Sequence, residues 1–160
     1  MGPSHPAITV REFLVAIGFV IGVNALGASP ALVVGSDTEW IARPWFYPPE
    51  ILFPLVWTLL FTLLGIALFL IWRSGVHRTD VRVAIGAFAL QFALNITWTP
   101  VFFGLQRPGF GFAIIVLLWI AIVGTIIAFH RVDRFAAWLL VPYLAWVTFA
   151  AALNWAIYVG

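Results

Sequence analysis

The chain has 160 residues, of which 64% are hydrophobic and only 9% charged, and its mean hydropathy is +1.09. These values exclude a soluble globular domain and predict an integral membrane protein. The formal charge of +2 comes from arginines that stand singly or in pairs near segment ends, which argues against nucleic acid as a partner, and the absence of cysteine excludes disulfides and thiolate chemistry.

Five apolar segments follow one another along the chain, each bounded by arginine, aspartate, proline or glycine. They cover about residues 11–34, 50–73, 81–104, 109–129 and 134–158. At about 1.5 Å per residue, each is long enough to cross roughly 30 Å of hydrocarbon as a helix. Because the segments use nearly the whole chain, we expect one all-α membrane domain over residues 1–160, a five-transmembrane-helix bundle.

The first segment, about residues 11–34, has an apolar stretch that is too long for a signal peptide. We therefore expect it to be retained as a membrane span. Gly18 and Gly22, four residues apart, would allow a neighbouring helix to approach closely.

The arginines outside the apolar segments predict an orientation. Six lie on one side of the expected bundle: Arg11, Arg73, Arg78, Arg82, Arg131 and Arg134. Arg43 and Arg107 lie on the other side. The positive-inside rule then places the N-terminus in the cytoplasm and the C-terminus outside, if the chain sits in a plasma membrane.

The connection over residues 35–49 is the longest between the expected spans. It is crowded with aromatic residues and prolines: Trp40, Pro44, Trp45, Phe46, Tyr47, Pro48 and Pro49. Long loops in compact bundles are often functional, and prolines stiffen them. Two interpretations stay open and are compatible: a lid over the mouth of the bundle, and an aromatic belt that anchors the second span at the lipid headgroups.

The second span carries Trp57 about 10 Å inside its start, deeper than a belt tryptophan needs to lie. Phe61 follows one turn later on the same helix face. The depth of Trp57 therefore argues against an interfacial belt residue at this position.

The third span holds two side-chain amides, Gln91 and Asn95, in a segment otherwise suited to hydrocarbon. At helical spacing they share one face with Phe88, Trp98 and Phe102. Burying an unpaired amide in an apolar medium costs roughly 2–7 kcal/mol, so this face should line the protein interior or a cavity rather than contact lipid.

The last two spans each carry a deep tryptophan. Trp119, at the centre of the fourth span, has no polar residue on its own helix face, and we expect it to face lipid or to pack. In the last span Trp146, Ala150 and Asn154 follow at i, i+4 and i+8 and share a face.

No ionisable residue lies in the middle of any expected span, which leaves no candidate for a proton relay or a general acid–base pair. His5, His77 and His130 all fall at the expected cytoplasmic edge, across the bilayer from the loop, so none is expected to ligate haem iron. We expect no metal site and no required cofactor. The aromatic area and the amides suit a large flat ligand held by stacking and shape.

Arg43 and Arg107 are the cations on the outer side, and each flanks a segment that should border such a pocket. A guanidinium group binds carboxylates bidentately, so these residues are candidates to hold carboxylate groups of a ligand. The alternative is that each anchors a helix end at the lipid headgroups.

Several motifs, in order along most of the chain, resemble those of the tryptophan-rich sensory protein family, also called the translocator protein or peripheral benzodiazepine receptor family. They are Arg43-Pro44, Pro48-Pro49, Phe53-Pro54-Leu55-Val56-Trp57-Thr58, Gly65, Leu94-Asn95, Trp98, Pro100, Phe102-Phe103-Gly104, Arg107-Pro108, Leu140-Val141-Pro142-Tyr143-Leu144-Ala145-Trp146, Phe149-Ala150 and Leu153-Asn154. The resemblance implies a five-helix bundle that binds porphyrins such as protoporphyrin IX and haem, sterols and isoquinoline-type ligands, commonly as a homodimer. Light-dependent porphyrin breakdown is assigned to some members.

Carried over by position, the resemblance implies a pocket lined by Trp57, Phe61, Asn95, Trp98, Trp146 and Ala150, and closed by Phe46 and Pro48. Gln91, from the same amide face as Asn95, completes the expected ligand-binding residues. Two departures from the family pattern stand out. Trp40 is followed by Ile41 where the family usually has Trp-Tyr, and Tyr158 has no arginine or lysine after it, so we expect no sterol recognition through the motif of animal members.

Three functions stay open at this point. The first is a membrane receptor or carrier for porphyrins, with stress sensing or tetrapyrrole regulation as its role. The second is an enzyme that degrades porphyrin under light and oxygen, with Trp57 and Trp146 as electron donors. The third is a scaffold that contacts partner membrane proteins.

Overall fold

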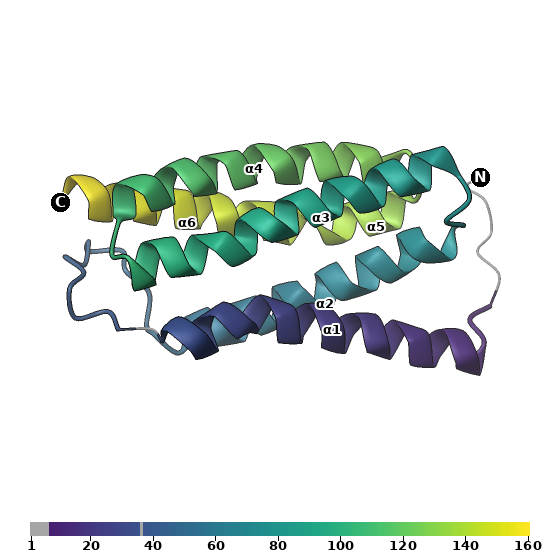
Figure 1. Cartoon of the computed structure of the whole chain (residues 1–160), viewed down its shortest axis with the longest axis horizontal. Coiled ribbons are helices and arrows are strands. Elements are labelled where there is room, and N and C mark those ends of the chain that lie inside the picture. Colours follow the sequence, from purple (N-terminus) through teal and green to yellow (C-terminus); the bar gives the residue numbers. More distant parts are fainter. Residues whose placement is uncertain (1–6, 36) are drawn as a thin grey trace.

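The computed structural model describes residues 7–35 and 37–160. Its elements are α1 (Val10–Val34), α2 (Leu52–Arg73), α3 (Thr79–Thr99), η1 (Pro100–Gly104), α4 (Pro108–His130), α5 (Arg134–Leu139) and α6 (Val141–Val159). Figure 1 shows an elongated bundle in which α1 begins at one end and α6 finishes at the other. Five candidate membrane spans and no strand occur in the described ranges, with α3 and η1 forming one span and α5 and α6 another. The prediction of an all-α, five-span membrane protein is confirmed.

Two helix starts are capped by side chains. Before α1, the Thr9 hydroxyl oxygen accepts a hydrogen bond from the Glu12 amide at 3.1 Å. Before α5, the Asp133 carboxylate accepts from the amides of Phe135 at 2.9 Å and Ala136 at 3.2 Å. Such caps satisfy the amide groups that have no partner inside a helix.

The third and fifth spans differ from the expected uninterrupted helices. At Pro100 the chain widens into the π-helix η1, and at Leu140 a turn separates α5 from α6 just before Pro142. Proline has no amide hydrogen to give to the preceding turn and its ring crowds that turn, which accounts for both changes.

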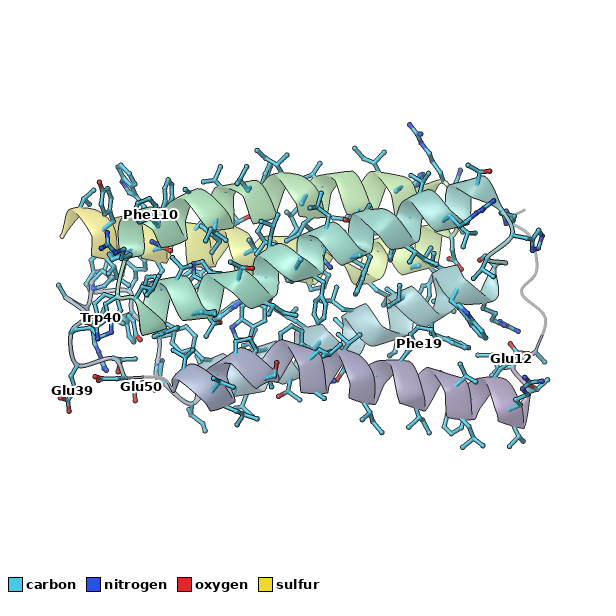
Figure 2. All side chains as sticks on the ribbon, in the orientation of Figure 1. Glu12, Phe19, Glu39, Trp40, Glu50 and Phe110 are labelled. Atoms are coloured by element: carbon cyan, nitrogen blue, oxygen red, sulfur yellow. The ribbon has the colours of Figure 1, made fainter. Side chains whose placement is uncertain are left out.

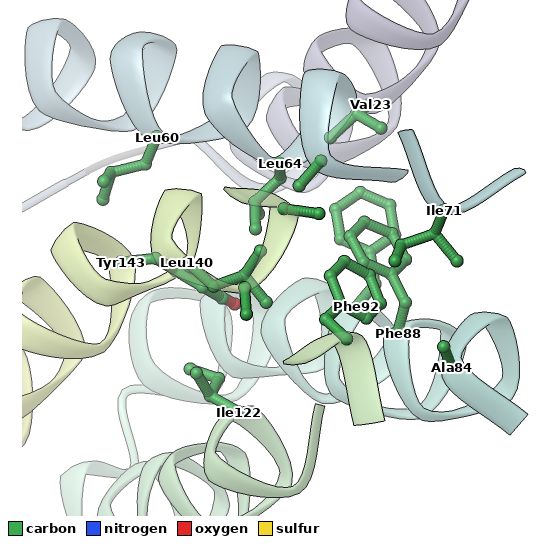
Figure 3. Close-up of a cluster of buried hydrophobic side chains, with 14 of the residues drawn as sticks. Val23, Leu60, Leu64, Ile71, Ala84, Phe88, Phe92, Ile122, Leu140 and Tyr143 are labelled. Carbon is green, nitrogen blue, oxygen red and sulfur yellow. The ribbon is translucent and has the colours of Figure 1, made fainter. Parts of the chain in front are cut away.

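The main core lies where α1 and α2 pack against α3, α4 and the start of α6. Figure 3 shows Leu64 of α2 and the rings of Phe88 and Phe92 of α3 meeting in this core. Within α3, the Phe88 and Phe92 rings are stacked with centroids 5.6 Å apart. The amide face of α3 therefore continues the apolar core, as its sequence pattern predicts.

Close contact between α1 and α2 depends on glycines other than the expected pair. A Cβ atom added at Gly65 would lie 2.7 Å from the Cα atom of Val20, and one at Gly27 would lie 2.5 Å from the ring of Phe61. A Cβ atom at Gly18 or Gly22 would meet nothing within 4 Å among the described residues. The expectation that Gly18 and Gly22 permit close helix packing is thus wrong for the contacts inside this chain.

Charged side chains gather at the two ends of the bundle. Figure 2 shows Glu12 at the end where α1 begins, and Glu39 and Glu50 at the opposite end, on the loop between α1 and α2. Glu12 pairs with Arg73 at the first end. The orientation of these ends relative to a membrane stays a prediction.

Candidate ligand-binding site

A cavity of about 380 Å³ lies in the half of the bundle next to the loop. Its walls come from α1, α2, α3, η1, α4 and α6, and the loop residues Thr38, Ile41 and Tyr47 border it. Most of the lining is apolar, and the volume falls in the usual range for small-molecule pockets.

Six of the residues expected to bind ligand line this cavity: Trp57, Phe61, Asn95, Trp98, Trp146 and Ala150. Phe46, Pro48 and Gln91 do not belong to the lining, and neither do Arg43 and Arg107. Phe46 lies against Phe149 at 6.3 Å between ring centroids, and Gln91 is fully buried behind the wall. Direct ligand contact by these five residues stays a prediction.

Aromatic rings give the cavity flat walls. On α2 the rings of Trp57 and Phe61 are stacked with centroids 5.3 Å apart, and on α3 and η1 those of Trp98 and Phe102 are stacked with centroids 4.8 Å apart. The edge of Trp146 meets Phe53 at 6.1 Å. Such surfaces suit an extended aromatic ligand, because offset stacking rewards parallel faces.

Asn154 holds one of these rings in place. Its Oδ1 accepts a hydrogen bond from Nε1 of Trp98 at 3.0 Å, and its Nδ2 donates to the carbonyl of Pro108 at 2.8 Å. This side chain thereby joins α3, α6 and the start of α4. The sequence pattern had placed Asn154 on the face of Trp146 but had not selected it as a site residue.

The amides of α3 are paired with a tyrosine of α6. Nδ2 of Asn95 donates to the Tyr143 hydroxyl at 2.8 Å, and this hydroxyl donates to Oε1 of Gln91 at 2.7 Å. Asn95 is 7% exposed, while Gln91 and Tyr143 are 0% exposed. The prediction that both amides avoid lipid is confirmed.

Two further polar groups belong to the wall, one without a hydrogen-bond partner and one bonded. Nε1 of Trp146 is buried and has no hydrogen-bond partner among the described residues. Asn24 of α1, which the sequence interpretation missed, borders the cavity and donates to Oγ1 of Thr62 at 3.2 Å. A lone amide in an apolar span is the same signal that singled out Asn95, so the sequence did carry it.

The loop is fastened over the mouth of the cavity. Ile41 is buried with Phe102, Leu153 and Ile157, and the Trp40 ring lies 5.3 Å from that of Phe102. These contacts favour the interpretation of the loop as a lid. Trp45, which is 95% exposed, still suits the second interpretation of an interfacial belt.

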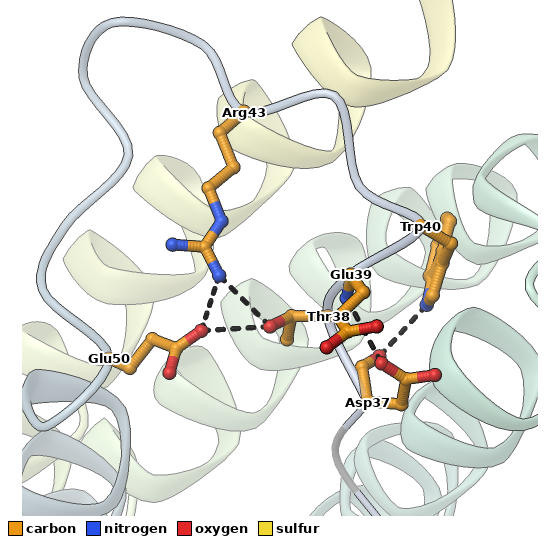
Figure 4. Close-up of polar contacts among 6 residues, drawn as sticks. All are labelled: Asp37, Thr38, Glu39, Trp40, Arg43 and Glu50. Carbon is orange, nitrogen blue, oxygen red and sulfur yellow. Dashed lines mark hydrogen bonds and ion pairs between the residues drawn. The ribbon is translucent and has the colours of Figure 1, made fainter.

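A polar network fixes the loop to the start of α2 (Figure 4). Nη2 of Arg43 donates to Oε1 of Glu50 at 2.5 Å and to the Thr38 hydroxyl at 3.0 Å, and that hydroxyl donates to the same Glu50 oxygen at 2.8 Å. The hydrogen bonds from Thr38 and Arg43 lower the pKa of the Glu50 carboxyl. The guanidinium of Arg43 also lies 4.8 Å above the ring of Tyr47.

Arg107 and Trp119 lie away from the cavity lining. The guanidinium of Arg107 lies 5.7 Å from the ring centroid of Phe110 at the start of α4. Trp119, expected to have no polar neighbour on its own helix face, donates through Nε1 to the Thr148 hydroxyl of α6 at 2.8 Å. Its polar partner comes from another helix, which a search along one span does not reveal.

His77 and His130 are remote from the cavity. His130 ends α4, twelve residues after Leu118 of the cavity wall, which corresponds to about 18 Å along a helix. His77 precedes α3 at the same end of the bundle, and His5 lies outside the described residues. The residues that the structure describes contain no cluster of three or more potential metal ligands of the histidine, cysteine or carboxylate type.

Comparison with known proteins places the chain in a family. The TspO/MBR family model matches residues 15–159. The Tryptophan-rich protein TspO of Chlorobaculum tepidum is 48% identical over 153 residues, which cover 92% of this chain and 97% of the relative. The protein of the same name from Archaeoglobus fulgidus is 39% identical, with coverage of 92% and 97%, and the Translocator protein of Sus scrofa is 35% identical, with coverage of 91% and 89%. With its five spans and its aromatic cavity under the first loop, the chain belongs to the TspO/MBR family.

Proposed function

We propose that this chain is a membrane receptor or carrier that binds porphyrins, such as protoporphyrin IX or haem, and related flat hydrophobic ligands in the cavity. Family membership supports a receptor or sensor role. The observation that carries the choice of ligand is the pair of stacked aromatic walls, Trp57 with Phe61 and Trp98 with Phe102, in the lining of one mostly apolar cavity. The proposal includes a homodimer in a lipid membrane, with sensing of stress or regulation of tetrapyrroles as the role.

The decisive experiment is a titration of the purified protein with protoporphyrin IX, followed by quenching of tryptophan fluorescence. Trp57→Phe and Trp146→Phe should each weaken binding about three- to tenfold, because phenylalanine keeps apolar area but loses part of the stacking surface and the indole donor. Trp138→Phe is the matched control, since Trp138 is 67% exposed on α5 and does not line the cavity.

If both cavity variants bind like the wild type, the ligand does not occupy this cavity. A titration without saturation for the wild type would instead favour a scaffold that contacts partner membrane proteins.

A second candidate function is light- and oxygen-dependent porphyrin breakdown. It is favoured by the presence of two oxidisable indoles, Trp57 and Trp146, in the lining of the same cavity. In such a reaction an excited porphyrin takes one electron from an indole and passes it to molecular oxygen, leaving an indole radical cation and superoxide that attack the macrocycle. Aerobic illumination of the complex distinguishes the two functions. If the chain is a receptor, the visible spectrum of the bound porphyrin should change no more in the wild type than in the Trp57→Phe variant. If it is an enzyme, the wild type should convert the porphyrin to a product with a new spectrum.

A further inference from the structure

Tyr143 stands between two amides that lie one helical turn apart on α3. Its hydroxyl is 2.8 Å from Nδ2 of Asn95 and 2.7 Å from Oε1 of Gln91. Gln91, Tyr143 and Asn95 are 0%, 0% and 7% exposed, so solvent does not compete for these bonds. We call these three residues the amide–phenol chain.

A hydroxyl group carries one hydrogen and can donate to only one of the two amides. The other amide must donate to the hydroxyl oxygen. The direction of the bond at one end of the amide–phenol chain therefore fixes the direction at the other.

Of the three residues of the amide–phenol chain, Asn95 is the one that lines the cavity. Because its Nδ2 is used by Tyr143, its Oδ1 is left for a ligand, and this oxygen has no hydrogen-bond partner within residues 7–35 and 37–160. In this arrangement the wall offers an acceptor. A ligand that donates an N–H or O–H group matches it.

The reverse arrangement uses the same positions. If both amides turn over, Gln91 donates to the hydroxyl, the hydroxyl donates to Oδ1 of Asn95, and Nδ2 of Asn95 faces the cavity as a donor. The two ends of an amide group have nearly the same size, so this exchange requires little movement of neighbouring atoms. A ligand with a carbonyl group matches this second arrangement.

Gln91 keeps the two arrangements close in energy. In the first, its Nε2 is buried without a partner among the described residues. In the second arrangement, Nε2 of Gln91 donates to Tyr143, and Oε1 of Gln91 becomes the buried atom without a partner. Each arrangement thus leaves one atom of the same amide unpaired, and a ligand bond to Asn95 is enough to select between them.

We propose that the amide–phenol chain reverses its direction with the ligand, so that one cavity accepts flat ligands that present either a hydrogen-bond donor or an acceptor to Asn95. Gln91, which lies outside the lining, is the positioning residue that permits both directions. The inference rests on the proposed function in one respect, the binding of a flat hydrophobic ligand in this cavity.

Three flat tricyclic compounds of the same size test it: carbazole, which donates through N–H, fluorenone, which accepts through its carbonyl, and fluorene, which does neither. Calorimetric titration of the full chain should show carbazole and fluorenone each binding about fivefold more tightly than fluorene, the contribution of about one net hydrogen bond. Comparison with fluorene removes the shared contribution of partition into detergent.

Gln91→Met separates the two directions. The methionine thioether is a far weaker acceptor than the Gln91 amide, so the hydroxyl donates preferentially to Oδ1 of Asn95, and Asn95 then presents its Nδ2 to the cavity. Fluorenone should keep its affinity while carbazole falls to the level of fluorene, which lowers the carbazole-to-fluorenone affinity ratio about fivefold. Leu90→Met is the matched control on the same helix, because Leu90 is 60% exposed and outside the cavity lining, and it should leave the ratio unchanged.

An unchanged ratio in a folded Gln91→Met variant overturns the proposal, and so does a wild-type protein that prefers only one of the two polar probes over fluorene. If Gln91→Met does not fold, infrared spectra of the wild-type complexes decide. The carbonyl stretch of bound fluorenone and the N–H stretch of bound carbazole should both shift to lower frequency, and both shifts should vanish in Asn95→Leu. A shift in only one of them overturns the proposal.

If none of the tricyclic compounds binds, the inference fails. The porphyrin titration with Trp57→Phe and Trp146→Phe decides the proposed function separately, because it does not depend on a hydrogen bond to Asn95.

Discussion

Asn154 and Asn95 illustrate two uses of a buried amide at the scale of single residues. Asn154 uses both ends of its side chain within the protein, accepting from Trp98 and donating to the Pro108 carbonyl. Asn95, which lines the cavity, uses only its Nδ2, on Tyr143. The first amide holds the wall together, while the second is free to recognise a ligand.

This difference predicts a small stability change at Asn95 and a larger one at Tyr143. Asn95→Leu removes one interhelical hydrogen bond but leaves Tyr143 bonded to Gln91, so the free energy of unfolding should fall by only about 0.6 kcal/mol. Tyr143→Phe strands both amides of α3 and should cost about 2 kcal/mol. Thermal unfolding in detergent measures both, and a larger loss for Asn95→Leu than for Tyr143→Phe would contradict this account.

Arg43 gives a second prediction at this scale, concerning the propionates of a porphyrin. In the structure its guanidinium is engaged by Glu50, so a ligand carboxylate must compete with that residue. Arg43→Gln should lower the affinity ratio of protoporphyrin IX to its dimethyl ester, and Glu50→Gln should raise it. Because exposed ion pairs are worth only about 0–1 kcal/mol, each change should stay within about fivefold.

Arg107→Gln should have a smaller effect alone, since Arg107 lies by Phe110 rather than in the lining, and should add to the effect of Arg43→Gln. If the double variant keeps the wild-type ratio, these arginines only anchor helix ends.

At the scale of elements, α1 and α2 are fitted to each other through Gly65. An added methyl group there would lie 2.7 Å from a backbone atom of Val20, which cannot move aside as a side chain can. Gly65→Ala should therefore force the two helices apart and lower the free energy of unfolding by about 1–3 kcal/mol.

Gly124→Ala is the control for Gly65→Ala. A Cβ atom at Gly124 meets nothing within 4 Å of the described residues, so alanine should be neutral or should stabilise α4 by up to about 1 kcal/mol through helix propensity. Thermal unfolding midpoints of the two variants should move in opposite directions. Equal shifts would mean that close packing at Gly65 is not required.

The sequence predicted the helical spans well but not their irregularities. Length and apolar composition determine where a chain can cross a bilayer, and these properties are local. The π-helix η1 and the break at Leu140 could have been predicted from the positions of Pro100 and Pro142. The sequence could not predict which glycines contact another helix. Gly18, Gly22, Gly27 and Gly65 are equivalent candidates until the rotation of each helix about its axis is known.

Within the cavity, the same division holds. Trp57, Phe61, Asn95, Trp98, Trp146 and Ala150 were expected from helix faces and from the family resemblance, and all line the cavity. Phe46 and Pro48 were expected from the family resemblance alone and lie outside the lining, because the path of a loop is not set by helical periodicity. The partner of the α3 amides, Tyr143, lies about fifty positions away in sequence and required the fold.

For the molecule as a whole, the loop over residues 37–50 links the cavity to the surrounding medium through Glu50. The pKa of the Glu50 carboxyl is lowered by hydrogen bonds from Thr38 and Arg43. The Glu50 carboxylate therefore fastens the loop at all pH values above the ordinary pKa of a glutamate. That contribution is lost as the pH falls through the lowered pKa. The loop should consequently loosen in acid and not in base.

Hydrogen exchange at the amides of Ile41 and Tyr47, which donate to the carbonyls of Thr38 and Pro44, measures this loosening. Exchange, corrected for its intrinsic pH dependence, should rise in the wild type only as the pH falls below the ordinary pKa of a glutamate and through the lowered pKa of Glu50, and Glu50→Gln should exchange at the higher level throughout. A Glu50→Gln loop that is as well protected as the wild-type loop at neutral pH would show that the carboxylate does not fasten it.

The ring of Trp40 on Phe102 has a consequence for the timing of ligand exchange. Trp40 seals the mouth without lining the cavity, so its contact is the same whether the cavity is filled or empty. Such a contact raises the barrier for entry and for escape equally. Trp40→Ala should therefore shorten the residence time of a bound porphyrin and accelerate its uptake by the same factor. The equilibrium affinity should stay unchanged, so the loop sets the rates of ligand exchange and not the strength of binding.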